Sequence, residues 1–156
     1  MTYIVRGLPA ASFTHLFGLP DDELAQHRTK RVVADAPNSY PDRIGLRDAE
    51  PGEVLLLLNY THQSTTSPYH ASHAIYVREG ASETGEAFDK VPEVMTRRLL
   101  SLRGFDQNDM IVSAKVVPGA EADPVIREML RDPDIRYIHA HNAAEGCYHG
   151  LIERSG

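Results

Sequence analysis

Hydrophobic and polar positions alternate over short stretches of the chain, which predicts strands along most of its length. The strand candidates are rich in apolar, β-branched and aromatic residues, and turn-forming residues separate them. They span residues 2–8, 54–58, 73–78, 97–105, 110–117, 135–142 and 147–154, with 31–34 as a further short candidate. The stretch 54–58 has no polar position, so we expect it to be covered on both faces near the centre of a sheet.

Apolar residues at helical spacing predict helices over 10–17, 21–27 and 123–130. The last of these has the clearest pattern, because Asp123 is suited to the N-cap and Pro124 to the first helical position. Between residues 79 and 90 the chain has two glycines and few apolar side chains, which predicts a mobile connection.

The order of these elements predicts an α+β fold. The strands mostly follow one another across short turns, which favours antiparallel pairing. We therefore expect a mostly antiparallel sheet of about six to seven strands with two to three helices. The 156 residues are an ordinary length for one domain, and no repeat or linker divides them, so residues 1–156 are predicted to form a single domain.

The formal charge of −6 at neutral pH argues against a nucleic-acid partner, because phosphate contacts require a basic surface. The one basic cluster, residues 27–31, directly follows acidic residues 21–23 and is interpreted as a solvated helix end. The longest apolar run, 54–58, is far shorter than the ~20 residues that span a bilayer. The N-terminus has no signal-peptide pattern. We expect no membrane partner and a cytoplasmic location.

His139 and His141 form the sharpest chemical motif in the sequence. They are two residues apart on a predicted strand, so their imidazoles point the same way and are able to approach one metal ion. A third ligand would come from His62 or His73, which lie at the ends of other predicted strands. The alternative is a pair of histidines that form ordinary hydrogen bonds in a polar pocket or at a sheet edge.

Cys147 is the only cysteine, so it forms no internal disulfide. A thiol becomes a nucleophile when a neighbouring imidazolium stabilises its thiolate, which makes Cys147 a candidate catalytic residue together with His139 or His141. His149, on the same strand as the thiol, is another candidate partner. The alternative is an unreactive buried thiol, as free cysteines usually are.

The register of the last two strands determines which histidine meets this thiol. A four-residue turn before Cys147 pairs His141 with Tyr148. Two residues further from the turn, His139 is then expected opposite Gly150. The thiol points to the other face, so its contact with either histidine requires an extra residue in one strand.

Arginines at or near the ends of predicted strands are candidates for ligand binding. The guanidinium fork matches carboxylate and phosphate geometry, so we expect Arg43 and Arg78 to hold an anionic small molecule. Arg103 is placed similarly, and the alternative for all three is a surface salt bridge. Further ligand contacts are expected from His62, Asn142 and Tyr148.

Short motifs that together resemble a known family occur along almost the whole chain. They are Tyr40-Pro41-Asp42-Arg43, residues 48–53, residues 56–60 followed by His62, Ser67-Pro68-Tyr69, residues 75–78, residues 98–103, and His141-Asn142 with Gly146-Cys147-Tyr148. The chain resembles the bacterial family catalogued as Domain of Unknown Function 1203. The resemblance implies one domain over the whole chain in a bacterial cytoplasmic protein, and it implies no activity. Where the family often has a cysteine after the Tyr-Pro pair, this chain has Asp42, which argues against a site that needs two thiols.

Two functions are compatible with these residues. The first is a small enzyme acting on a polar or anionic small molecule, with His139 or His141 as general acid or base. The second is a non-catalytic regulatory or protein-interaction module, in which the same pocket senses a metabolite or a metal. The sequence has no glycine-rich phosphate loop, dinucleotide fingerprint or Gly-x-Ser-x-Gly elbow, so it names no cofactor. It also selects no oligomeric state.

Overall fold

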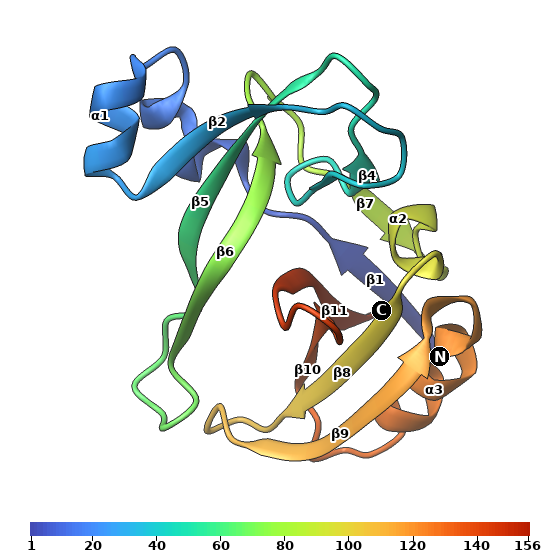
Figure 1. Ribbon diagram of the computed structural model, residues 1–156. Coiled ribbons are helices and arrows are strands. Elements are labelled where there is room, and N and C mark those ends of the chain that lie inside the picture. The colour runs from blue at the N-terminus through green and yellow to red at the C-terminus, as the bar shows by residue number, and fades with distance from the viewer.

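The computed structural model describes residues 1–156, and its largest element is a six-stranded sheet with the order β7-β1-β11-β10-β8-β9. Its strands are β1 (Thr2–Arg6), β7 (Glu86–Phe88), β8 (Leu99–Phe105), β9 (Ile111–Pro118), β10 (Tyr137–Asn142) and β11 (Tyr148–Ser155). Every pairing in it is antiparallel, which confirms the predicted sheet. Because β1 pairs with β11, the two ends of the chain lie close together (Figure 1).

Two smaller sheets complete the β structure. The three-stranded sheet contains β2 (Thr29–Val33), β5 (Val54–Gln63) and β6 (Ala71–Arg78), and a two-stranded one pairs β3 (Pro41–Asp42) with β4 (Arg47–Asp48). The apolar run 54–58 lies in the central strand β5 as expected, although Leu57 is only half-buried. Figure 1 shows β5 and β6 on one side of the β10–β11 hairpin and α3 (Ala122–Leu130) on the other.

The helices are short, and they complete the predicted α+β fold. Besides α3, they are α1 (Asp21–Gln26), α2 (Glu93–Thr96) and the 3₁₀ turns η1 (Ala10–Ser12), η2 (Thr14–Leu16) and η3 (Gly119–Glu121). The prediction of one helix over 10–17 is wrong, because two 3₁₀ turns occupy this stretch. Asp123 is not the N-cap of α3, and its carboxylate accepts hydrogen bonds from Tyr3 and Arg127 instead. None of the helices combines the length and apolar character needed to cross a membrane.

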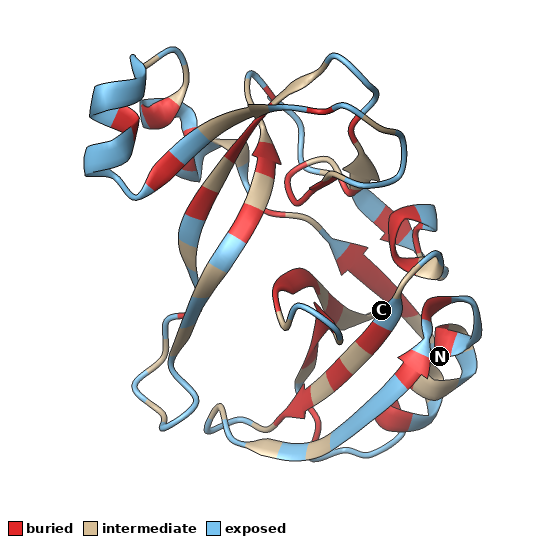
Figure 2. Ribbon diagram, in the orientation of Figure 1, coloured by how far each residue is buried: buried red, intermediate tan, exposed pale blue.

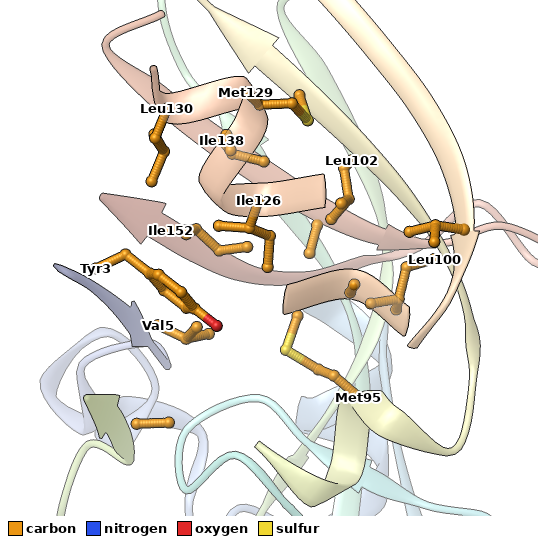
Figure 3. Close-up of a cluster of buried hydrophobic side chains, with 14 of the residues drawn as sticks. Tyr3, Val5, Met95, Leu100, Leu102, Ile126, Met129, Leu130, Ile138 and Ile152 are labelled. Atoms are coloured by element: carbon orange, nitrogen blue, oxygen red, sulfur yellow. The ribbon is translucent and has the colours of Figure 1, made fainter. Parts of the chain in front are cut away.

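Two large apolar clusters form most of the core, and the β10–β11 hairpin contributes to both. The larger cluster packs side chains of the six-stranded sheet against α2 and α3, with Ile138, Ile152 and Ile126 among its members (Figure 3). The second cluster joins β5 and β6 to the N-terminal turns and includes Leu56 and Tyr148. Figure 2 shows buried positions along β10 and the first half of β11, whereas β9 is largely exposed. The hairpin is therefore packed from both sides.

Part of the predicted mobile connection over 79–90 is a strand. β7 pairs with β1 at the edge of the large sheet. The amide of Gly85 donates to the carbonyl of Ile44 at 2.8 Å. A Cβ atom at Gly85 would lie 2.1 Å from the Gly45 carbonyl oxygen, so only glycine permits this close approach.

The turn between β10 and β11 is closed by two backbone hydrogen bonds. The Asn142 amide donates to the Cys147 carbonyl at 2.9 Å, and the Gly146 amide donates to the Asn142 carbonyl at 2.8 Å. Gly146 has a φ of 83°, in the left-handed region that glycine adopts without strain. The turn thereby directs the Gly146 carbonyl toward the neighbouring strand.

A β-bulge next to this turn changes part of the predicted register. His141 has its predicted partner. His139 lies opposite Leu151, so the predicted pairing with Gly150 is wrong. The shift arises because His149 is an extra residue in β11. Ala140 pairs with Gly150 and His141 with Tyr148, so no residue of β10 lies opposite His149.

Candidate functional site

The polar side chains of the β10–β11 hairpin divide between its two faces. Asn142 contacts Cys147 and His149 on one face. His139 and His141 turn to the other face, where both approach β5. This division follows from the alternation of side chains along a strand. The single pocket expected from the sequence is therefore two sites. We call them the anion cavity, after the anionic ligand that the sequence leads us to expect, and the histidine cluster.

The anion cavity has a volume of about 490 Å³ and lies between β6, segment 38–43 and the β10–β11 turn. This volume is within the range of small-molecule sites. Its polar lining includes Ser39, Arg43, His73, Arg98, Asn142, Glu145 and Cys147. Apolar contact area comes from Leu57, Ala74 and Tyr76 on β5 and β6. The cavity therefore combines apolar walls with several converging polar groups.

Arg43 is the one fully buried charged residue among those that line this cavity, with 1% exposure. Its Nε donates to the Tyr148 carbonyl at 3.0 Å and its Nη1 to the Pro41 carbonyl at 2.8 Å. Its Nη2 lies 3.0 Å from Cys147 Sγ, and the guanidinium forms no ion pair with a carboxylate. Burial lowers the pKa of Arg43, since desolvation disfavours the charged form. A guanidinium nevertheless stays protonated near neutral pH, so a cation with no carboxylate within ion-pair distance borders the cavity.

Cys147 joins this cation to a buried hydrogen-bond chain. Asn142 Nδ2 lies 3.5 Å from Cys147 Sγ, and Asn142 Oδ1 accepts from His149 Nδ1 at 2.8 Å. Burial holds the pKa of His149 well below its usual range, so this imidazole is neutral. Because Asn142 lies between them, His149 acts on the thiol only through the amide.

The histidine cluster is formed by His62 at the end of β5 and by His139 and His141 on β10. The ring centroids of His62 and His141 are 4.9 Å apart. The ring centroid of His139 lies 6.4 Å from each of them. One ring nitrogen from each residue lies within 4.8 Å of the other two. His73, the other third-ligand candidate of the sequence, borders the anion cavity instead and lies 3.2 Å from the Ala74 carbonyl.

All three imidazoles of the cluster are neutral near pH 7. Burial lowers the pKa of His62 and of His139 to about 4 and that of His141 to about 3. The positive charge of Arg103 contributes to all three of these lowered values, because it disfavours a second cation nearby. Each ring therefore has one unprotonated nitrogen, whose lone pair is able to accept a hydrogen bond or bind a metal.

Hydrogen bonds determine how these lone pairs are oriented. His141 Nδ1 lies 2.9 Å from the Gly146 carbonyl, and because a carbonyl only accepts, Nδ1 carries the proton. The lone pair of His141 is therefore on Nε2. Nδ1 of His62 and Nδ1 of His139 are buried without any hydrogen-bond partner. The Tyr148 ring stacks on His62 at 5.5 Å with an interplanar angle of 8°, which limits the rotation of that imidazole.

Arg103 is the charged neighbour of the histidine cluster. It lies directly across from His139 on the adjacent strand β8. Its Nε donates to Ser101 Oγ at 3.2 Å, and its half-buried guanidinium forms no ion pair. Each of the two sites therefore includes an arginine without a carboxylate partner.

Residues 39–154 match the family model described as a protein of unknown function, DUF1203. The chain belongs to the DUF1203 family. No curated protein and no solved structure matches it. The range matched by the DUF1203 model contains Arg43 and Cys147 as well as the three clustered histidines.

Arg78 belongs to neither site of this DUF1203 protein. Its guanidinium lies 3.9 Å from the Asp42 carboxylate and 3.8 Å from that of Glu53. Asp42 is buried and accepts hydrogen bonds from backbone amides, including the Arg78 amide at 2.9 Å. Both residues therefore hold the backbone in place, and neither lines the cavity. Tyr148, expected as a ligand contact, lies against the histidine cluster.

Sequence patterns did not indicate Arg98 as part of this DUF1203 site. It lines the cavity while its Nη2 donates to the Asp48 carboxylate at 2.7 Å. Ser39 and Tyr76 were missed as well, and all three come from segments that meet only in the folded chain. The one available signal was Tyr40-Pro41, which predicts a turn close to Arg43.

Proposed function

We propose that this protein binds a small anionic molecule in the anion cavity, with Arg43 as the main recognition group. The observation that carries the proposal is a fully buried guanidinium without a carboxylate partner at the wall of a cavity of about 490 Å³. Taking a charge out of water is costly, and a bound anion offsets this cost. The guanidinium has five N–H groups. Its three hydrogen bonds to the protein do not use all of them, so donors remain for a ligand.

Carboxylates and phosphates are the chemical class that this arrangement favours. Both accept paired hydrogen bonds from a guanidinium, and Asn142 adds an amide that bonds oxygen or nitrogen groups. Leu57, Ala74 and Tyr76 supply the apolar surface for the carbon skeleton of the ligand.

A second candidate function is covalent chemistry at Cys147. The observation in its favour is the distance of 3.0 Å between Arg43 Nη2 and Cys147 Sγ, because a guanidinium stabilises negative charge on sulfur. The general-base role expected for His139 or His141 does not extend to this thiol, since both imidazoles lie on the opposite face of the hairpin. A free thiol also fits the reducing cytoplasm expected from the sequence.

The single cysteine gives a direct assay for occupancy of the cavity. We expect glycerol 3-phosphate, inorganic phosphate or citrate to slow the alkylation of Cys147 by iodoacetamide at least severalfold. Uncharged glycerol, the matched control, leaves the rate unchanged. The proposal fails if none of these anions protects Cys147, or if glycerol protects it equally well.

A variant that fills the cavity separates binding from general effects on the thiol. Ala74 lines the cavity and is exposed, so Ala74→Trp blocks the space without changing the buried hydrogen-bond chain. Protection by anions is then lost. The control is Val116→Trp on β9, a position that is 65% exposed and outside the cavity, which retains full protection.

A further inference from the structure

Three imidazoles from two different sheets converge on the face of the hairpin that the anion cavity does not use. One nitrogen from each of His62, His139 and His141 lies within 4.8 Å of the other two. A four-coordinate metal with bonds of ~2.1 Å needs nitrogen separations of roughly 3.4 Å. The three rings are edge-on or tilted to one another, so metal binding would require the side chains to move closer together.

The hydrogen-bonding pattern of the cluster is the one expected of histidines that bind a metal. His141 donates its Nδ1 proton to the Gly146 carbonyl, the outer contact that typically orients a metal-binding histidine. Nδ1 of His62 and Nδ1 of His139 are buried without a hydrogen-bond partner. This is unusual and lowers the stability of the fold, because buried polar atoms are normally hydrogen-bonded. We propose that His62, His139 and His141 form a binding site for a divalent transition metal of the zinc type.

The donor set determines the class of metal. Neutral imidazoles suit Zn²⁺, Co²⁺, Ni²⁺, Cu²⁺ and Fe²⁺, whereas Ca²⁺ and Mg²⁺ require oxygen ligands. Cys147 cannot add a thiolate, because it contacts Asn142 and Arg43 on the opposite face. Three protein ligands leave one position open, as in catalytic sites and unlike closed structural ones.

Local charge indicates what fills the open position. The metal would add two positive charges beside Arg103, which lies across from His139 and has no ion pair. No carboxylate belongs to the cluster, and Asp109, whose charge acts on His139, accepts a hydrogen bond from the Tyr137 hydroxyl. The fourth ligand is therefore an anion, either hydroxide or the carboxylate or phosphate group of a small molecule, with Arg103 as its second contact. His62 and Arg103 are half-buried, so solvent reaches the site on their side.

This inference does not depend on the anion cavity. The two sites share no side chain, and each has its own arginine. The Cys147→Ser variant, which changes the cavity, is therefore a matched control that keeps the metal site intact.

Titration of the full-length, tag-free protein with Co²⁺ tests the proposal, because four-coordinate Co²⁺ gives intense visible bands. We expect one equivalent to bind and His62→Ala to weaken the affinity at least tenfold. Cys147→Ser is expected to bind like the unaltered chain. His15→Ala with His27→Ala, which removes an exposed histidine pair, is also expected to have no effect.

A second variant keeps the test valid if His62→Ala does not fold. His139→Gln preserves size and hydrogen bonding while it removes an imidazole ligand, and it should lose Co²⁺ binding to a similar extent. With Co²⁺ bound, acetate or phosphate should change the spectrum, and Arg103→Met should weaken this response severalfold. Equal Co²⁺ affinity in His62→Ala, in His139→Gln and in the unaltered chain, or no binding at all, would overturn the proposal.

Discussion

At the scale of single residues, Arg43 stands out because its charged side chain is fully buried. Its guanidinium is buried, carries a charge, and interacts with two backbone carbonyls and one sulfur atom. These contacts join β3 to the start of β11, so the same residue stabilises the fold and lines the anion cavity. Its removal should therefore affect both properties.

Arg43→Met is expected to lower the free energy of unfolding by roughly 2–4 kcal/mol, because two buried carbonyls lose their donor. Protection of Cys147 by anions should disappear as well. Urea unfolding and the alkylation assay measure these two effects. The control Arg78→Met loses two long ion pairs of 3.8 and 3.9 Å, one of them to the fully buried Asp42, so it also lowers stability but leaves anion protection unchanged.

The buried histidines make the stability of the metal-free protein sensitive to acid. His139 and His141 have pKa values of about 4 and about 3 in the folded chain, below the usual value of 6.5. As the pH falls below 6.5, the unfolded chain takes up protons that the folded chain does not, so stability decreases. We expect His139 and His141 alone to account for a loss of roughly 4 kcal/mol between pH 7 and pH 5, and His62 and His149, whose pKa values burial also lowers, add to it.

Urea titrations in the presence of a chelator measure this pH dependence. His139→Gln should remove only part of it, because His62, His141 and His149 are also held neutral by burial and still contribute. Equal stability of the unaltered chain at pH 7 and pH 5 would show that these rings are not held neutral by burial.

At the scale of elements, the β10–β11 hairpin arranges both sites. Its two strands were predicted from their apolar pattern, and the turn between them follows from Gly146. The bulge at His149 was not predicted, because an extra residue leaves no mark on the alternation of so short a strand. The 3₁₀ turns at 10–16 were mistaken for a helix, since Phe13 and Leu16 fit either period.

The geometry of the turn is open to a direct test. Gly146→Ala places a side chain at a φ of 83°, which costs about 1 kcal/mol. The same strain displaces the carbonyl that orients His141, so Co²⁺ affinity should fall as well.

Gly18→Ala is the matched control for this variant. Gly18 has a φ of 78° and nothing within 4 Å of the position of a new Cβ atom. It should cost similar stability and leave Co²⁺ affinity unchanged. Identical Co²⁺ affinity in both variants would contradict the role of the turn.

At the scale of the whole molecule, the two apolar clusters meet at the hairpin. Ile138 and Ile152 belong to one cluster and Tyr148 to the other, so neither cluster is complete without β10 and β11. This sharing favours a single cooperative unit. Leu56→Ala in the second cluster and Ile126→Ala in the first should each cost about 2–5 kcal/mol.

Both variants should shift one common unfolding transition. Tyrosine fluorescence and far-UV circular dichroism, recorded on the same urea titration, measure it. Two separate transitions, each moved by only one of the variants, would contradict a single cooperative unit.

The architecture could be predicted from the sequence more completely than the sites. Alternation of apolar residues is a local property, and it indicated the main strands and their antiparallel order. The convergence of Arg43 with Cys147, or of His62 with His141, depends on contacts between residues distant in the chain. The alternation of side chains along a strand did predict that the thiol and the two histidines of β10 lie on different faces, even though one predicted pairing was wrong.

The central claim is that Arg43 holds an anion next to Cys147, and NMR of the arginine Nε–H groups tests it most directly. In the metal-free protein, addition of glycerol 3-phosphate should shift the Arg43 signal along a saturable curve and leave the Arg78 signal in place. An unchanged Arg43 signal, or equal shifts of all arginines, would contradict the claim.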